Sequence, residues 1–185
     1  MKEVRIHARA GQGAITTAGV LGSAIFKSGR YSYAFPYFGA ARMGAPMNAF
    51  LRFDEKQIRL RSQVYEPDFV LVIDRTLTYG YNCFTGLKEN GVVIIDDEKE
   101  NLSAYEGLSS SQKIFAVPAS DIAYQTIGRK LGNTTILGAF AAATGEVSLE
   151  DLFAAIDERF AGKGAIADKN KEALQKGYDY IKENY

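Results

Sequence analysis

The chain has 185 residues, 46% of them hydrophobic and 24% charged, which is the length and apolar content of one compact domain spanning residues 1–185. Its 22 basic and 22 acidic residues balance, so the composition favours neither nucleic acid nor an anionic membrane surface as a partner. A single cysteine, Cys83, excludes an internal disulfide and cannot supply the thiolates of an iron–sulfur cluster or a structural zinc site. The N-terminus lacks a signal-peptide pattern and no apolar run reaches about 18 residues, so a cytoplasmic location without a membrane span is expected.

The first predicted elements are a strand at Val4 to Ala8, a glycine turn, and a helix at Ile15 to Phe26. In α/β proteins this order exposes backbone N–H groups at a helix N-terminus, where an anionic group can be held. Gly11 and Gly13 match the start of a dinucleotide fingerprint, but Thr16 stands where its third glycine is due. The turn therefore predicts either a phosphate site or a tight connection that serves packing only.

The middle of the chain predicts a sheet. Short Val- and Ile-rich runs near Val70, Val92 and Ile114 are apolar on both faces, which is typical of central parallel strands covered by helices. Alternating polar and apolar residues in 48–52 and 57–60, on either side of 54–56, predict a hairpin at the sheet edge. Further strands are predicted at 31–35 and 47–53.

From Ala119 onward the pattern is helical, with helices predicted near 119–127, at 136–143, at 149–160 and at 165–185. Ser148 precedes the third of these and is expected to cap it. The predicted fold class is thus α/β: an open Rossmann-like mixed sheet flanked by helices, with a β-hairpin edge and a helical C-terminal part.

Several polar residues have both a binding and a structural interpretation. Arg42 lies among small residues that let a ligand approach, so it suits a phosphate, a carboxylate or a partner's acid, or alternatively a local acid or carbonyl. Asp74 ends a buried strand and is either a site acid or a helix cap. Asn133 and Thr134 precede a helix and favour a cap first and a pocket edge second. The only histidine, His7, is interpreted as structural rather than catalytic.

The sequence lacks a metal-ligand cluster, a nucleophile elbow and a Walker lysine. An anion-binding type of turn in a chain so poor in catalytic groups indicates a binding or assembly domain whose chemistry lies on other chains.

A set of motifs in this order resembles one family over nearly the whole chain: Arg9-Ala10-Gly11-Gln12-Gly13-Ala14, Ala34-Phe35-Pro36 with Phe38-Gly39, Arg42-Met43-Gly44-Ala45-Pro46, Ala49-Phe50 with Arg52, Pro67-Asp68, Asn133-Thr134 with Leu137-Gly138-Ala139, and Asn170, Ala173 and Gly177-Tyr178. The chain is similar in these motifs to the gamma subunit of the 2-oxoacid:ferredoxin oxidoreductases. Its Arg-Met-Gly-Ala-Pro loop resembles the pyruvate and branched-chain oxoacid enzymes more than the 2-oxoglutarate ones.

This resemblance implies one subunit, inactive alone, of an enzyme that oxidatively decarboxylates a 2-oxoacid to an acyl-coenzyme A and passes electrons to ferredoxin. Alpha, beta and delta subunits, separate or fused, would be its partners and would carry thiamine diphosphate, magnesium and the 4Fe-4S clusters. The resemblance also implies a coenzyme A contact at nine residues of this chain, with no catalytic or metal-ligating residue among them: Gly11, Gln12, Gly13, Ala14, Arg42, Gly44, Ala45, Asn133 and Thr134.

Two other functions stay open on the sequence. One is a structural partner domain without a ligand, which requires the glycine turn to serve packing only. The other is a stand-alone nucleotide-binding oxidoreductase, which the missing third glycine and the lack of an acid in 31–34 disfavour.

Overall fold

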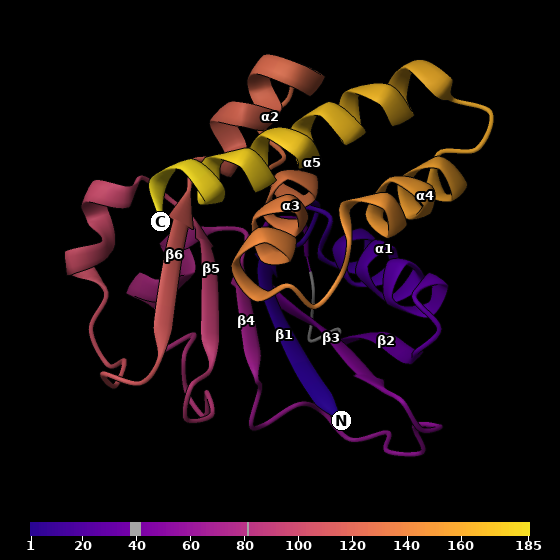
Figure 1. The fold of residues 1–185 in the computed structure, drawn as a ribbon. Coiled ribbons are helices and arrows are strands. Elements are labelled where there is room, and N and C mark those ends of the chain that lie inside the picture. The colour runs from indigo at the N-terminus through magenta and orange to yellow at the C-terminus, as the bar shows by residue number, and fades with distance from the viewer. Residues whose placement is uncertain (38–41, 81) are drawn as a thin grey trace.

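The computed structural model describes residues 1–37, 42–80 and 82–185. Within these residues, six strands form one mixed sheet in the order β2-β3-β1-β4-β5-β6 (Figure 1). The strands are β1 (Lys2–Arg9), β2 (Tyr31–Tyr37), β3 (Pro46–Asp54), β4 (Phe69–Val72), β5 (Val92–Asp96) and β6 (Lys113–Val117). β1, β4, β5 and β6 run parallel, whereas β3 pairs antiparallel with both β1 and β2. The strands predicted at 4–8, 31–35 and 47–53 and near Val70, Val92 and Ile114 are confirmed, as is the α/β class with a mixed sheet.

The helices follow the predicted order. They are α1 (Ala14–Lys27), α2 (Ala119–Ile127), α3 (Asn133–Thr144), α4 (Leu149–Arg159) and α5 (Gly164–Asn184), with short 3₁₀ helices η1 (Arg75–Tyr79) and η2 (Lys99–Ala104). Ser148 caps α4 as predicted, because its side chain accepts a hydrogen bond from the Asp151 backbone N–H. Among the described residues, no helix is long and apolar enough to cross a membrane.

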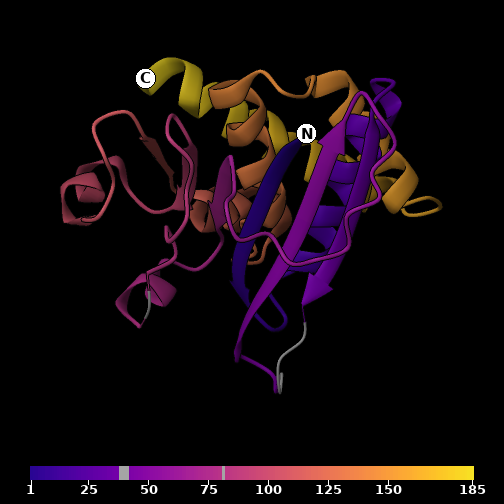
Figure 2. The same cartoon turned by 90° about the horizontal axis from the view of Figure 1, so that it is seen from below.

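The two faces of the sheet are covered differently. α1, α3, α4 and α5 lie over one face (Figure 1), and their apolar side chains form the larger core with the strand residues beneath them. The segments that contain η1 and η2 lie on the other face (Figure 2), where Leu77, Cys83 and Phe84 form a smaller core against β4 and β5. Cys83 is fully buried there and packs as a small apolar residue.

The closest helix contact is the crossing of α3 and α5. A Cβ atom added to Gly138 would lie 1.8 Å from the backbone oxygen of Leu174, and one added to Gly177 would lie 2.2 Å from the oxygen of Thr135. Only glycine permits this approach, since both obstacles are backbone atoms that cannot rotate away. Two motifs of the family resemblance, at Gly138 and Gly177, are therefore explained by packing.

The predicted hairpin of 48–52 with 57–60 is wrong. Residues 48–52 belong to β3, but 57–60 are not a strand. β3 already has β1 on one side and β2 on the other, so no edge of β3 is left for a further strand. The alternation in 57–60 reflects instead the burial of Ile58 between exposed neighbours. The antiparallel edge of the sheet is the pair of β2 and β3.

The predicted cap at Asn133 and Thr134 is also wrong. α3 begins at Asn133, its N-cap is Gly132, and no side chain caps it. A Cβ atom on Gly132 would lie 2.7 Å from the backbone carbon of Ala119, so the start of α2 leaves no room for a capping side chain. Asn133 and Thr134 are thereby free to make contacts outside their own helix.

Candidate functional site

The predicted site residues gather at one edge of the sheet. The parallel strands β1, β4, β5 and β6 all end at this edge, and β3 begins there because it runs antiparallel to β1. In open α/β sheets, ligands bind in the crevice outside the carboxyl ends of the strands. The glycine turn after β1 and residues 42–45 before β3 therefore lie where a ligand site is expected. Residues 38–41, part of the motif that carries the family resemblance, are outside the described ranges.

The glycine turn has the conformation that only glycine adopts readily. Gly11 and Gly13 have φ of 99° and 86°. Gly13 is the N-cap of α1, with no side-chain cap and no acidic residue in the first helical turn. The backbone N–H groups at the start of α1 are therefore not neutralised by a carboxylate of their own turn, and the helix dipole adds to their attraction for an anion.

The turn of residues 42–45 packs directly on the glycine turn. Ala10 donates a backbone hydrogen bond to Ala45 at 2.9 Å, and Gly44 donates one to Ala10 at 3.1 Å. A Cβ atom on Gly11 would meet the Met43 sulfur at 2.8 Å. Arg42 is exposed, and no hydrogen bond or ion pair of its side chain is recorded in the described part of the chain. The two segments that the sequence singled out separately thus form one surface with an available guanidinium.

Asn133 and Thr134 are placed differently from each other. Asn133 lies against the glycine turn, since a Cβ atom on Gly13 would be 2.8 Å from its Nδ2 atom. Thr134 is 3% exposed and donates a hydrogen bond of 2.9 Å to Oδ1 of Asn170, so it joins α3 to α5. Ala14 is also buried and offers only its backbone. Of the three, only Asn133 brings a side chain to the edge.

Asp74 is a helix cap, which is one of the two interpretations that the sequence left open. It is the N-cap of η1 and accepts hydrogen bonds from the Thr76 backbone and hydroxyl. Its Oδ2 atom also accepts a hydrogen bond of 2.8 Å from Nε2 of Gln12 and lies 3.2 Å from Nε of Arg9. Partial burial alone would raise the pKa of Asp74, but these hydrogen bonds and the charge of Arg9 outweigh burial and lower the pKa. Asp74 is therefore an ionised group that holds the glycine turn against β4.

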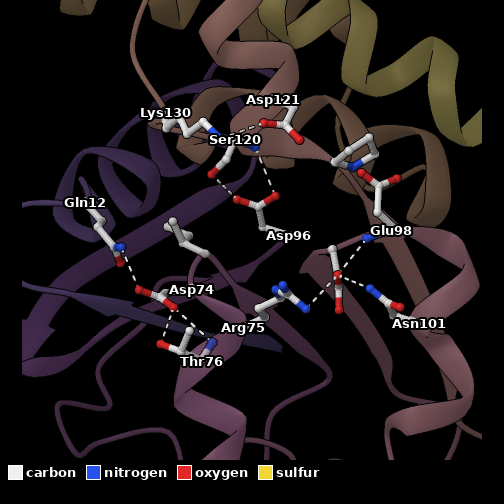
Figure 3. Close-up of a pocket in the computed structure, with 13 residues that line it drawn as sticks. Gln12, Asp74, Arg75, Thr76, Asp96, Glu98, Asn101, Ser120, Asp121 and Lys130 are labelled. Carbon is white, nitrogen blue, oxygen red and sulfur yellow. Dashed lines mark hydrogen bonds and ion pairs between the residues drawn. The ribbon is translucent and has the colours of Figure 1, made fainter.

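An acid-lined cavity of about 310 Å³ opens on one side of Gln12 (Figure 3). Asp74, Asp96, Asp97, Glu98 and Asp121 line it, and most of these acids are paired within the protein. Asp96 accepts hydrogen bonds from the backbone and hydroxyl of Ser120. Asp97 accepts from Asn101 and Tyr105 and lies 3.3 Å from Arg75, and Asp121 pairs with Lys130 at 3.1 Å.

The pKa values of two neighbouring acids of this cavity, Asp96 and Asp97, are shifted in opposite directions. Burial raises the pKa of Asp96, and the two hydrogen bonds from Ser120 only partly offset burial. Burial also disfavours the charge of Asp97, but hydrogen bonds from Tyr105 and Asn101 and the charge of Arg75 lower its pKa. Tyr105 is half-buried and hydrogen-bonded to Asp97, and both effects raise its pKa, so it stays protonated as the donor.

A second pocket of about 420 Å³ lies on the other side of Gln12. Gly11 and Gly13 border it from the glycine turn, Thr16 from α1, Asn133 from α3 and Asn170 from α5. Its remaining lining is apolar or basic: Ile127, Leu131, Phe160, Ile166, Arg129 and Lys169. The two pockets are therefore neighbours with opposite chemistry, one acidic and the other apolar with a basic rim.

His7 has a structural role in β1. It is 3% exposed, and its Nε2 atom accepts a hydrogen bond of 3.1 Å from Nε of Arg5. Burial and the nearby charge of Arg5 lower its pKa from 6.5 to about 3, so the imidazole is neutral near pH 7. This agrees with the structural interpretation of the only histidine.

Sequence reasoning missed Asp96, Ser120, Arg129 and Lys169. Asp96 ends β5, Ser120 lies at the start of α2, Arg129 follows the end of α2, and Lys169 lies near the start of α5. They meet at the edge only through the tertiary fold. Asp96 had one usable signal, since it ends an apolar strand just as Asp74 does. Among the described residues, no group of three or more His, Cys, Asp or Glu side chains is arranged to hold a metal ion.

The model of the family described as pyruvate ferredoxin/flavodoxin oxidoreductase matches residues 3–180 of the chain. The chain is 46% identical over 182 residues to pyruvate synthase subunit PorC of Methanothermobacter marburgensis, covering 98% of each chain. It is 45% identical over 180 residues to the common gamma subunit of the pyruvate/ketoisovalerate oxidoreductases of Thermococcus kodakarensis, covering 97% of this chain and 96% of that one.

Solved structures agree with the fold. The crystal structure of pyruvate oxidoreductase subunit PORC from Thermotoga maritima aligns with a TM-score of 0.81 and 38% identity, over 96% of this chain and 95% of that one. A 2-oxoglutarate:ferredoxin oxidoreductase from Magnetococcus marinus, solved with 2-oxoglutarate, coenzyme A and succinyl-CoA bound, aligns with a TM-score of 0.81 and 18% identity. All of this chain matches 31% of that longer one, which shows a shared fold.

Proposed function

Because the chain belongs to the pyruvate ferredoxin/flavodoxin oxidoreductase family, as a gamma subunit of a multi-subunit 2-oxoacid:ferredoxin oxidoreductase, we propose that it supplies a coenzyme A contact to that enzyme. The enzyme decarboxylates a 2-oxoacid oxidatively to an acyl-coenzyme A and transfers the electrons to ferredoxin. We assign this chain binding and assembly, and we assign the bond-breaking chemistry to its partners.

The observation that carries this proposal is the surface made by the glycine turn and residues 42–45. Backbone N–H groups at the start of α1, the exposed Arg42 and the absence of an acid in the first turn of α1 together favour an anionic ligand. Coenzyme A carries several phosphates, and the Magnetococcus marinus enzyme of the same fold was solved with coenzyme A bound. Gly11 and Gly13 permit the positive φ of the turn and leave room for Met43 and Asn133 to pack against it.

The proposed contact residues have distinct roles. Gly11, Gly13 and Ala14 offer backbone, Gln12 orients the turn through Asp74, and Arg42 pairs with a phosphate. Gly44 and Ala45 have no side chain beyond Cβ and so do not block the neighbouring surface, and Asn133 packs beside Gly13. Thr134 acts indirectly, because its hydroxyl holds Asn170 at the edge of the second pocket.

Partner subunits complete the enzyme in this proposal. Alpha, beta and delta subunits, separate or fused, carry thiamine diphosphate, magnesium and the 4Fe-4S clusters, and ferredoxin accepts the electrons. Two exposed aromatic residues, Tyr37 at 45% and Tyr79 at 78% exposure, are candidate anchors for these partners. Pyruvate or a branched-chain oxoacid is the proposed substrate, since the relatives in Methanothermobacter marburgensis and Thermococcus kodakarensis carry those names.

The test is coenzyme A-dependent reduction of ferredoxin by the purified complex with pyruvate as donor. Arg42→Ala is expected to raise KM for coenzyme A about tenfold, which corresponds to about 1.4 kcal/mol, with little change in kcat at saturating coenzyme. Arg59→Ala is the matched control, because Arg59 is exposed and follows the end of β3 that lies away from the site. An unchanged KM in an intact Arg42→Ala complex would assign Arg42 to a structural role. The ligand-free alternative predicts that outcome for every turn variant.

A further inference from the structure

We propose that the outer edge of β2, the side of this strand that faces away from β3, pairs with an extended segment of the partner subunit that carries thiamine diphosphate. The pairing lengthens the sheet by one strand beyond β2. This inference rests on the proposed function, because it takes its partner from the enzyme described there. It concerns a surface on which no ligand has been placed above.

The two outermost strands of the sheet, β2 and β6, are finished differently (Figure 1). At β6 the Ala116 backbone N–H donates to the Tyr185 hydroxyl at 3.2 Å, and this hydroxyl donates to the Ala116 oxygen at 3.3 Å. The Tyr185 ring also packs on Phe115, with ring centres 5.0 Å apart. Within the described ranges, β3 is the only strand that pairs with β2, so the backbone groups on its outer edge face no further strand.

The sequence of β2 lacks the charges that usually protect such an edge. Residues 31–37 contain no Lys, Arg, Asp or Glu, whereas natural edge strands are commonly blunted by charged residues or by proline. Pro36 is the one such residue in β2, and it removes a single backbone donor near the end of the strand. Tyr31, Ala34, Pro36 and Tyr37 are all exposed. An uncharged aromatic strand left open in this way is suited to strand addition by another chain.

The two faces of β2 differ in what they offer to an added strand. Ser32 and Ala34 face α1, because a Cβ atom on Gly22 would lie 3.6 Å from the Ser32 Oγ and Ala34 Cβ atoms. Successive side chains of a strand point to opposite faces, so Tyr33 and Phe35 lie on the face away from α1. Their rings stack with centres 5.1 Å apart. A strand that pairs with β2 continues this aromatic row, and cross-strand neighbours of this kind stabilise a sheet.

The position of β2 in the sheet identifies the partner. β1 and β2 run in the same direction, because both pair antiparallel with β3, so β2 ends at the carboxyl edge of the sheet. Its last residue, Tyr37, is 45% exposed, and the turn of residues 42–45 lies between it and β3 in the chain. Coenzyme A bound at that turn has to reach the acyl group made from the 2-oxoacid, so the subunit that holds this group stands at the same edge. The outer edge of β2 is continuous with that contact.

The experiment uses the complex assembled from this chain and its co-expressed partner subunits. Tyr31→Lys/Tyr37→Lys places two charges on the exposed strand and is expected to raise the dissociation constant between this chain and its partners at least about tenfold. The matched control, Tyr65→Lys/Tyr124→Lys, makes the same replacements at two exposed positions outside β2 and should stay within about twofold of wild type. Circular dichroism of each variant chain checks that it is folded.

A second measurement uses the wild-type sequence and needs no variant. Amide hydrogen exchange of residues 31–37 is expected to be slower in the complex than in the isolated full-length chain, because strand pairing protects the outward N–H groups. Residues 113–117 of β6 serve as the internal reference, since Tyr185 covers that edge in the chain by itself.

Strand pairing is overturned if the β2 variant assembles like wild type, if the control variant weakens assembly equally, or if residues 31–37 gain no protection in the complex. Protection that grows with the concentration of the isolated chain would mean that β2 pairs with a second copy, which overturns the choice of partner. The coenzyme A contact is judged separately, by KM for coenzyme A in the Arg42→Ala complex. Either proposal can therefore fail while the other stands.

Discussion

The crossing of α3 and α5 and the carboxyl edge of the sheet both depend on glycine, but for opposite reasons. At the crossing, Gly138 and Gly177 allow two backbones to touch, and each added Cβ atom would strike a carbonyl oxygen. At the edge, Gly11 and Gly13 provide the positive φ of the turn before α1, and Met43 and Asn133 pack against them. The same residue type therefore serves the close approach of two backbones in one region and a left-handed backbone conformation in the other. Substitutions should accordingly cost folding at the crossing and ligand affinity at the edge.

The largest effect is expected for Gly138→Ala. The added methyl group would lie 1.8 Å from the Leu174 oxygen, so α3 and α5 must separate along their contact. We expect a loss of at least about 4 kcal/mol in the free energy of unfolding, a large part of the roughly 5–15 kcal/mol available to a typical domain. Urea unfolding and the yield of folded chain measure this loss.

The control for Gly138→Ala is Gly19→Ala in the interior of α1, where nothing lies within 4 Å of an added Cβ. That variant should be neutral or stabilise by about 0.5–1 kcal/mol, because alanine is the better helix former. Equal stability of the two variants would show that α3 and α5 do not approach as closely as described.

Asn170 tests whether the two regions are linked. It is 6% exposed, it accepts from the Thr134 hydroxyl at 2.9 Å and donates to the Ile166 oxygen at 2.8 Å, and it also lines the pocket at the edge. Asn170→Ala leaves the buried Thr134 hydroxyl without its acceptor, which costs about 2 kcal/mol. Urea unfolding of Asn170→Ala, Thr134→Val and the double variant forms a double-mutant cycle. The double variant should lose clearly less than the sum of the single losses, and strict additivity would contradict the link.

Gly13→Ala is expected to have a smaller effect on folding and a clear effect on binding. Its φ of 86° costs an alanine about 1–2 kcal/mol, and the new methyl group would also press on Asn133 Nδ2 at 2.8 Å. Gly29→Ala is matched in conformation, with φ of 89° and nothing within 4 Å, so it isolates the cost of the backbone. KM for coenzyme A in the purified complex should rise only for Gly13→Ala. A rise of the same size in both variants would mean that stability alone sets the affinity.

Much of this fold is predictable from local pattern. Val- and Ile-rich runs correctly predict β4, β5 and β6, because a strand that is buried on both faces needs apolar residues at every position. The hairpin at 57–60 failed because alternation records which side chains are buried and not which strand is the neighbour. The predicted side-chain cap of α3 was wrong because Ala119 fills the space beside Gly132. Ala119 is distant from Gly132 in the sequence, so a local pattern cannot reveal this contact.

The residues of the site also fall into those with a local sequence signal and those without one. The glycine turn and Arg42 carry local signals, namely positive-φ glycines before a helix and small residues around an arginine. Arg129 and Lys169 carry no local signal, since 39 residues of helices and loops separate them and an exposed basic residue in a sequence has many uses. Their meaning depends on which carboxylates lie near them, and that is a property of the folded chain. The same holds for Asp96, whose environment is set by Ser120 from beyond the next strand.

The smallest expected effect concerns pH and the acids of the edge. Burial raises the pKa of Asp96 above its ordinary value of 3.8, so between that value and the raised one the folded state holds a proton that the unfolded state releases. The stability that Asp96 contributes is therefore present below about pH 3.8 and is lost as the pH rises through the raised pKa. Asp96→Asn removes this titration and with it the loss of stability at rising pH. Between about pH 4 and pH 7 the free energy of unfolding of the variant should therefore rise more, or fall less, than that of wild type.

Asp74 provides the opposite sign on the same edge. Its hydrogen bonds from Thr76 and Gln12 lower its pKa in spite of partial burial, so its contribution is present above 3.8 and is lost as the pH falls through the lowered value. The free energy of unfolding of Asp74→Asn should therefore rise less than that of wild type as the pH rises from below 3.8 to just above it, measured by urea unfolding at each pH. Two variants that shift the profile in the same direction would contradict the opposite environments of the two carboxylates. Opposite shifts would establish that the edge combines one desolvated acid with one that is fixed as an anion, and it is the fixed anion that holds Gln12 between the two pockets.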